Sequence, residues 1–362
     1  MLLDYDVALE DDFQQLLAHL PAPVRDLLTD VDTDAHHERQ AVYTLFGAGS
    51  PTSELTQAVE CLALATNLNR ASFTPKPTLN DLAISKAQAY ASQYLGQRFN
   101  QLVVHATGLA DTTKQDLFTA ATELPLANLN RLRLNFNQRE RIADFLKDTK
   151  DRSARLTGLS AELAASLADT DAAVSGLARA IGETIGIIAK IHHDVQDTRQ
   201  IADFHERLLR GDYPLPLLFG FENEAGYFYD FFHQAHQPTA DQFVAAQQKV
   251  LATGLEPALT MANELVDQAR LDCQQLPAGD TRQRVERALE RLTATNSKAW
   301  VTRRTLMGSS TTVASGYSSL SFWFNLISHQ QLAASKSSRW ITSMRLLFGQ
   351  LFMIQPLPVV AR

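Results

Sequence analysis

Apolar residues recur along most of this chain with the period of an α-helix. The clearest example is a helix expected over residues 175–200, whose apolar residues step by four, three, three and four along one face: Ile181, Ile185, Ile188, Ile191 and Val195. The strict two-residue alternation that indicates a half-buried strand is nearly absent before residue 300. The pattern therefore predicts an all-α domain of ten or more helices.

Sequence signals at the ends of helices support this prediction. Ser50 precedes Pro51, the order expected of an N-cap followed by proline at the first helical position. Thr239 lies three residues before Gln242, which is the spacing of a capping box. Further helices are predicted over stretches rich in alanine, leucine and glutamine, notably residues 80–104 and 153–167.

Two glycines, Gly182 and Gly186, lie one turn apart in the helix expected over residues 175–200. Each glycine destabilises a helix interior by about 1 kcal/mol relative to alanine, so glycines are unfavourable in an ordinary surface helix. Small residues at this spacing let a second helix approach closely. We therefore predict that both glycines have a packing role.

The composition fits one large folded domain or two small ones. The chain has 362 residues, of which 45% are hydrophobic and 20% are charged, and its formal net charge is -7. This charge balance does not indicate a nucleic-acid-binding protein. We therefore expect no nucleic acid among its partners.

The cysteines and the first residues bear on the location of the protein. Cys61 and Cys273 lie far apart and outside any CxxC or Cys/His spacing, so a reducing compartment, the cytoplasm, is expected. The N-terminal stretch MLLDYDVALEDD lacks the basic region of a signal peptide. No run of about 18 apolar residues predicts a transmembrane helix.

The C-terminal part differs in charge from the rest of the chain. Glu290 is the last acidic residue, and eight basic residues follow it. We therefore divide the chain into an all-α domain over residues 1–290 and a basic extension over residues 291–362. Three interpretations of the extension stay open: a basic surface for a membrane or a diphosphate, a poorly structured extension, or a shifted reading frame.

The strongest candidate chemistry lies in the stretch IGETIGIIAKIHHDVQD. On a helix, one face carries four polar residues because residues three and four apart are neighbours: Lys190, His193, Asp194 and Asp197. Two carboxylates at this spacing can hold a hard divalent cation that bridges diphosphate oxygens. The alternative is the ordinary solvated side of an amphipathic helix, opposite the isoleucine stripe.

This stretch resembles the second aspartate-rich segment of the trans-prenyl diphosphate synthases, which has the form GxxxGxxxQxxDDxxD. Six residues take the Gly, Gly, Gln and DDxxD places in order: Gly182, Gly186, Lys190, His193, Asp194 and Asp197. The later stretch GDYPLPLLFG, residues 211–220, looks like the family's GKxTLPLxxA. The two matches follow each other as the family's segments do.

Weaker matches precede this segment. RSARL, which begins at Arg152, looks like KTAxL, whose basic residue contacts diphosphate in the family. AVECLALATNLNRA looks like the helix of the first DDxxD, with Glu60 at its characteristic glutamate. HERQA, with Arg39, is a faint echo of the GGKRxRP segment that binds the homoallylic diphosphate. The resemblance covers about residues 40–225.

The chain departs from the family at several functional positions. The first DDxxD would fall at Arg70, Ala71 and Thr74, none of which is a carboxylate. His193 replaces the first aspartate of the second motif, and imidazole is a poor Mg²⁺ ligand. Asp212 stands where the family has the lysine of GKxT. Both aspartate-rich motifs are therefore degraded.

The resemblance implies an isoprenoid synthase-type helical bundle around a central cavity, normally a homodimer. If active, the protein would transfer or condense prenyl groups from an allylic diphosphate with Mg²⁺, in isoprenoid biosynthesis. Asp194 and Asp197 would hold the metal and Asp203 would assist. The implied diphosphate contacts are Arg39, Arg152 and Lys190, and the implied positioning residues are Glu60 and His193.

Two other classes of function stay open. One is a non-catalytic partner subunit of an active prenyl synthase, which the missing first carboxylate cluster favours. The other is a prenyltransferase that modifies a peptide pheromone, since some relatives with reduced first motifs act in this way. The sequence alone leaves undecided whether the protein is an enzyme.

The aromatic stretch FENEAGYFYDFFHQ, residues 221–234, has two interpretations as well. It could form an aromatic wall beside a prenyl chain, or it could be ordinary core packing, which is more common for such a run.

Overall fold

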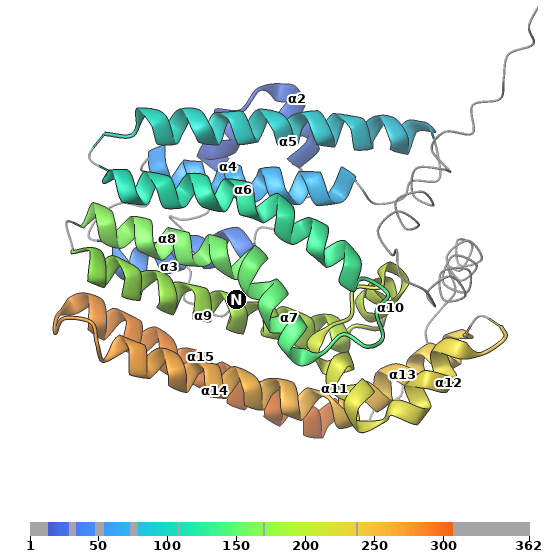
Figure 1. Ribbon diagram of the computed structural model, residues 1–362. Helices are drawn as coiled ribbons and strands as arrows, with labels where there is room; N and C mark the ends of the chain where they lie inside the picture. Colours follow the sequence, from blue (N-terminus) through green and yellow to red (C-terminus); the bar gives the residue numbers. More distant parts are fainter. Residues whose placement is uncertain are drawn as a thin grey trace, which may run out of the picture. The chain divides into compact units, whose positions relative to one another are not determined.

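The computed structural model describes residues 14–28, 34–47, 54–72, 79–107, 109–168, 171–236 and 238–306. Within these residues it contains the fourteen α-helices α2 to α15, a further helical stretch over residues 14–18, one 3-10 turn, one π-helical segment and no strand (Figure 1). The predicted all-α class with ten or more helices is confirmed. The helices belong to one compact unit, residues 1–233 and 238–310.

The helices have the following bounds in chain order: α2 Ala22–Arg25, α3 Asp34–Phe46, α4 Glu54–Ser72, α5 Leu79–His105, α6 Asp111–Leu134, α7 Ile142–Thr149, α8 Arg155–Leu167, α9 Ala172–Arg199, α10 Ile201–Arg210, α11 Leu215–Asn223, α12 Ala225–His233, α13 Ala240–Thr253, α14 Leu255–Cys273 and α15 Asp280–Leu306. The 3-10 turn η1 covers Asp26–Leu28, and the π-helical segment η2, Lys150–Ala154, joins α7 to α8.

Helix ends follow the predicted chemistry where the structure describes them. At the start of α13, the Thr239 hydroxyl accepts from the Gln242 N–H at 3.3 Å, and the Gln242 side chain accepts from the Thr239 N–H at 2.7 Å. This reciprocal pair is the predicted capping box. The predicted start at Ser50 and Pro51 lies outside the described residues.

α8 packs closely against α9, and the two helices run side by side in Figure 1. A Cβ atom on Gly182 would lie 2.7 Å from the Ala161 Cβ atom, and one on Gly186 would lie 2.8 Å from the Ala154 Cα atom. Both distances are shorter than side chains tolerate, so only glycine permits this approach. The predicted packing role of both glycines is confirmed.

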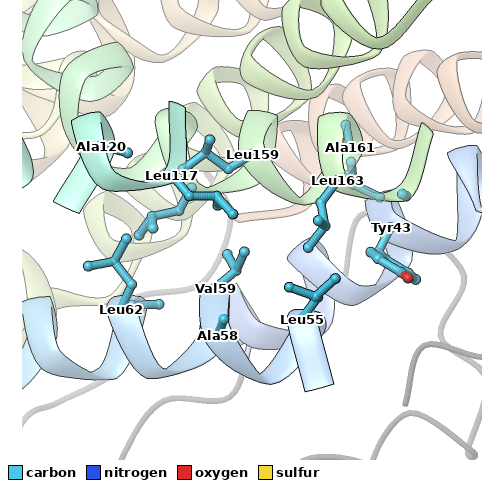
Figure 2. Packing of buried hydrophobic residues seen from close by; sticks show 14 of the residues in the cluster. Tyr43, Leu55, Ala58, Val59, Leu62, Leu117, Ala120, Leu159, Ala161 and Leu163 are labelled. Atoms are coloured by element: carbon cyan, nitrogen blue, oxygen red, sulfur yellow. The ribbon is translucent and has the colours of Figure 1, made fainter. Parts of the chain in front are cut away.

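The apolar core fills the space between α3, α4, α6 and α8 (Figure 2). Side chains from these four helices point toward one another and are almost completely buried: Tyr43, Leu55, Val59, Leu62, Leu117, Leu159 and Leu163. Burial of each large side chain contributes roughly 1.5–3 kcal/mol. The central cavity that the resemblance implies for the bundle stays a prediction.

The aromatic stretch after α10 is core packing. The Phe221 ring contacts the rings of Tyr213, Phe228 and Phe232, and Phe232 also contacts Tyr213, with centroids 5.3–5.8 Å apart. Tyr213, Phe228 and Phe232 are buried. Tilted and edge-to-face contacts at such distances stabilise aromatic clusters beyond the burial of their area.

α9 meets the length and composition of a membrane-crossing helix, which the sequence prediction did not anticipate. It is the one such helix among the described residues, and half of its most apolar window is buried inside the bundle. It packs on α8 and α14. The core position of α9 gives a sufficient reason for its apolar composition.

The predicted boundary at residue 290 falls inside α15, which continues to Leu306. The remainder of the basic extension, residues 307–362, lies outside the described residues. A peripheral membrane contact through this extension stays a prediction.

Candidate functional site

The polar end of α9 faces α10 and the turn that leads into α11. Gly211 ends α10 in the left-handed conformation, with a φ of 64°, which glycine adopts without the steric penalty of a Cβ atom. The chain then reverses direction. As a result, Asp212 contacts Arg207, and the backbone N–H of Leu215 reaches Asp194.

Both carboxylate oxygens of Asp194 have protein partners. Oδ1 accepts from Lys190 Nζ at 2.5 Å and from Arg207 Nη1, and Oδ2 accepts from the Leu215 N–H at 2.9 Å. Burial alone would raise the pKa of Asp194, which is 0% exposed, but Arg207 and Lys190 outweigh this effect and hold the pKa below its usual value. The interpretation of this face as a solvated surface is therefore wrong for Asp194.

Arg207 joins Asp194 to two further carboxylates. Its Nη1 lies 2.9 Å from Asp197 Oδ2, and its Nη2 lies 3.3 Å from Asp212 Oδ2. The side chains of Asp197 and Asp212 are 36% and 39% exposed, whereas that of Arg207 is 10% exposed. The guanidinium group thus contacts all three carboxylates.

Arg131 extends these contacts toward α7. Its Nη1 donates to Glu140 at 2.7 Å and lies 3.6 Å from Asp148, while its Nη2 donates to Asp212 at 2.6 Å. Arg152, in η2, donates to both oxygens of Asp148 at 2.9 and 2.5 Å. The side chain predicted to meet a diphosphate is therefore paired within the protein.

We call this connected set the ion network. It comprises four cationic side chains and five carboxyl groups: Lys190, Arg131, Arg152 and Arg207 with Asp148, Asp194, Asp197, Asp212 and Glu140. Burial raises the pKa of Glu140 to about 7, against the opposing effect of Arg131. One carboxyl group is therefore partly protonated near neutral pH, and the charges of the network nearly balance.

A second buried cluster joins α3, α4 and α9. Arg39 donates to both oxygens of Glu60 at 2.9 and 2.6 Å, and His36 Nδ1 lies 2.9 Å from the same carboxylate. Burial opposes ionisation of Glu60, but Arg39 and His36 outweigh it and lower the pKa to about 2. His193 Nε2 lies 3.1 Å from Glu38 Oε1. Arg39 and His193 are thus held by carboxylates outside the ion network.

The remaining predicted positions lie elsewhere. Asp203 is exposed in the first turn of α10 and does not take part in the ion network. Arg70 and Ala71, at the place of the first aspartate motif, lie near the end of α4, and Thr74 lies outside the described residues. The structure therefore brings Lys190, Asp194, Asp197 and Arg152 into one network and leaves Asp203 out.

The described residues do not fit a Mg²⁺ ion at the predicted position. Mg²⁺ needs near-octahedral oxygen ligands, whereas the Asp194 oxygens already bind two cationic side chains and an amide. Across the described ranges, no group of three or more acidic, histidine or cysteine side chains could hold a metal. Lys190 and Arg207 are the cationic side chains that bind Asp194 in this structure, while the predicted roles of Asp194 as a metal ligand and of Lys190 as a diphosphate contact stay predictions.

Sequence reasoning missed Arg207 and Arg131, although helical periodicity contains a signal for both. Arg207 lies between Phe204 and Leu208 on the buried face of α10. Arg131 continues a buried stripe of α6 that steps by three or four residues: Leu117, Ala120, Leu124, Ala127 and Arg131. An arginine on an apolar stripe requires buried carboxylate partners, which is a signal that could have located the network.

No protein-family model matches the chain, and no curated protein sequence matches it either. Solved structures do. Geranylgeranyl pyrophosphate synthase from Lactobacillus brevis is 21% identical, with a TM-score of 0.67 over 79% of this chain and 94% of that one. Decaprenyl diphosphate synthase from Rhodobacter capsulatus is 20% identical, with a TM-score of 0.62 over 80% and 97%.

Heptaprenyl diphosphate synthase from Staphylococcus aureus is similar at 15% identity, with a TM-score of 0.62 over 80% of this chain and 98% of that one. These likenesses span nearly the whole of each relative, so they concern the complete helical arrangement. Together with the helix order and the all-α bundle, they establish that this chain has the fold of the trans-prenyl diphosphate synthases.

Proposed function

We propose that this protein serves isoprenoid biosynthesis as a non-catalytic partner subunit of an active prenyl diphosphate synthase. The observation that carries the proposal is Asp194, which is fully buried and bound by Lys190, Arg207 and the Leu215 amide. The fold shared with polyprenyl diphosphate synthases supports a prenyltransferase-like context.

The charges of the ion network argue against ionisation of an allylic diphosphate by this chain alone. The leaving diphosphate carries several negative charges, which must be stabilised by cations as the C–O bond breaks. Arg131, Arg152, Lys190 and Arg207 are already neutralised by carboxylates at short distances. Removal of one partner from a buried ion pair costs about 3–5 kcal/mol, so these cations are not free to bind an anion.

A chain-elongation assay tests the proposal. The purified protein is incubated with isopentenyl diphosphate, an allylic diphosphate such as farnesyl diphosphate, and Mg²⁺. We expect no longer product from the chain alone, and a changed rate or product length when it is mixed with an active trans-prenyl synthase of the same cell. Elongation by the chain alone, lost in Asp197→Asn, would overturn the proposal.

A divergent prenyltransferase is the second candidate, and one observation favours it. Asp197 and Asp212 both contact Arg207 and are each more than one-third exposed, so solvent reaches one side of the ion network. Titration calorimetry of an allylic diphosphate with and without Mg²⁺ distinguishes the two candidates. Mg²⁺-dependent binding that is abolished in Asp197→Asn supports the enzyme, and its absence supports the partner subunit.

We also propose that the protein is located in the cytoplasm. Cys61 and Cys273 are both buried free thiols, as a reducing compartment would keep them.

A further inference from the structure

A further group of charges, outside the ion network, lies where α6, α8 and α9 meet. Nη1 of Arg179 on α9 lies 3.3 Å from Glu162 Oε2 on α8 and 3.9 Å from Asp116 Oδ2 on α6. Nε of the same guanidinium group lies 3.2 Å from Glu183 Oε1. We call these four residues the carboxyl cluster, in which one arginine contacts three carboxyl groups from three helices.

The carboxyl cluster is part of the packing of α8 against α9. The side chains of Glu162 and Glu183 are 9% and 14% exposed. A Cβ atom on Gly158 would lie 2.5 Å from Glu183 Cγ and 3.0 Å from the Arg179 carbonyl oxygen. Glycine at position 158 therefore lets this part of α9 lie directly on α8, beside Glu162.

The carboxyl groups around Glu162 outnumber the positive charges. α9 contributes Arg179 and Glu183, and α6 contributes Asp116. From η2, Lys150 lies 3.3 Å from Glu183, but its side chain is 59% exposed, so water screens this pair. α3 and α4 pack on α8 through apolar side chains (Figure 2). With every carboxyl group ionised, the cluster would carry excess negative charge, which a bound proton reduces.

Glu162 is the group that holds this proton. Burial and the neighbouring Asp116 raise the pKa of Glu162 to about 7, against the opposing effect of Arg179. The side chains of Glu162 and Asp116 are hydrogen-bonded, so the protonated Glu162 donates to the Asp116 carboxylate and links α8 to α6. Loss of the proton replaces this hydrogen bond by two adjacent like charges.

α6 is the helix that can respond to this change, because close glycine contacts fix α8 to α9. Pro125 lies inside α6 and has no N–H to donate to the preceding turn, and α6 changes direction in its middle (Figure 1). After the proline, Arg131 is held in the ion network. Just before it, Glu123 contacts Arg155 of α8. Opening of α6 would therefore be confined to residues 111–122.

We propose that Glu162 and Asp116 form a proton-dependent latch, which holds residues 111–122 of α6 on α8 below neutral pH and lets them open more readily above it. The latch is independent of the proposed function, because its residues lie outside the ion network. The closed form dominates on both sides of neutral pH, since Leu117 and Ala120 of this part of α6 are buried in the core.

Hydrogen exchange of the full chain, followed by mass spectrometry of its peptides, tests the latch. Protection factors correct for the intrinsic pH dependence of exchange and report local opening. The closed form holds a proton up to about pH 7, whereas in the open form Glu162 has its usual pKa of 4.5 and has released it. We therefore expect the protection of residues 111–122 to fall about tenfold from pH 6 to pH 8.

Two variants of nearly unchanged shape test the residues of the latch. Glu162→Gln donates to Asp116 at every pH, so the protection of residues 111–122 should change less than about twofold between pH 6 and pH 8. Asp116→Asn removes the like charge beside Glu162 and should move the fall in protection to lower pH. Circular dichroism confirms that each variant folds.

Glu222→Gln on α11 is the matched control, because Glu222 is exposed and lies on another helix, and it should keep the full response. Glu140→Gln should keep it as well, since Glu140 contacts Arg131 on the other side of Pro125. Protection of residues 111–122 that is equal at pH 6 and pH 8 would overturn the proposal. So would a tenfold fall that persists in Glu162→Gln, or that occurs at the same pH in Asp116→Asn.

Discussion

Two parts of α9 are stabilised in different ways: a glycine half that ends at Gly186 and a polar half that follows it. In the glycine half, Gly182 and Gly186 bring α9 against α8 at distances that exclude any side chain. In the polar half, Asp194 is buried and Lys190 is half-buried among charged groups from α10 and the α11 turn. Close packing stabilises the glycine half, and paired charges hold the polar residues of the second.

The comparison teaches that burial has different requirements for apolar and polar residues. A close apolar contact needs only that the residues be small enough, which a short stretch of sequence specifies. A buried carboxylate needs cations of matching geometry, and Arg207 comes from the following helix. The polar half therefore depends on residues that its own sequence does not contain.

The largest expected effect is the loss of Asp194. Asp194→Ala leaves Lys190 and Arg207 without their shared buried partner, and we expect the free energy of unfolding to fall by about 3–5 kcal/mol. Urea denaturation measures this change. Asp197→Ala is the control, because Asp197 is partly exposed, and its effect should stay below about 1 kcal/mol.

A double variant sharpens this expectation. Arg207 keeps Asp197 and Asp212 in Asp194→Ala, whereas Lys190 loses the carboxylate that it contacts at 2.5 Å. Lys190→Met replaces this ammonium group by an apolar chain, so its addition to Asp194→Ala should recover part of the lost stability. Equal destabilisation by Asp194→Ala and Asp197→Ala would contradict this expectation, because the buried Asp194 would then contribute no more stability than the partly exposed Asp197.

An intermediate effect is expected in the glycine half. Gly186→Ala places a Cβ atom 2.8 Å from the Ala154 Cα atom, so the helices must separate, and we expect a loss of about 1–3 kcal/mol. Gly176→Ala is the matched control on the same helix, because nothing lies within 4 Å of its added Cβ atom. It should stabilise the protein by about 1 kcal/mol, since alanine favours a helix more than glycine.

Thermal unfolding of the two glycine variants separates packing from helix propensity. If Gly186→Ala is as stable as Gly176→Ala, the close approach of α8 and α9 does not constrain this position.

The smallest of these effects concerns pH. Burial raises the pKa of Glu140 to about 7 from 4.5, so the folded protein binds a proton that the unfolded chain has released. Its contribution to stability is therefore present below pH 4.5 and is lost as pH rises through 7. We expect about 1 kcal/mol less stability from this group at pH 8 than at pH 6.

Glu140→Gln removes this proton and should flatten the stability profile between pH 6 and pH 8, while Glu222→Gln on α11 should leave it unchanged. Glu222 is exposed and lies outside the ion network. A profile that stays as steep in Glu140→Gln would show that another group titrates.

The sequence by itself determined the helical class, the capping box at Thr239 and the packing role of Gly182 and Gly186. These features depend on periodicity and residue size over short stretches, which a single helix encodes. The resemblance around HHDVQD also indicated the fold, which the solved structures confirm.

Only the tertiary structure decided what the polar residues do. Spacing placed Lys190, Asp194 and Asp197 on one face, yet a solvated face, a metal site and a buried ion network share that spacing. The Arg207 side chain, brought back by the turn between α9 and α10, selects the ion network. Electrostatic interactions act through space, so the role of a charge is fixed by partners that only the fold brings near.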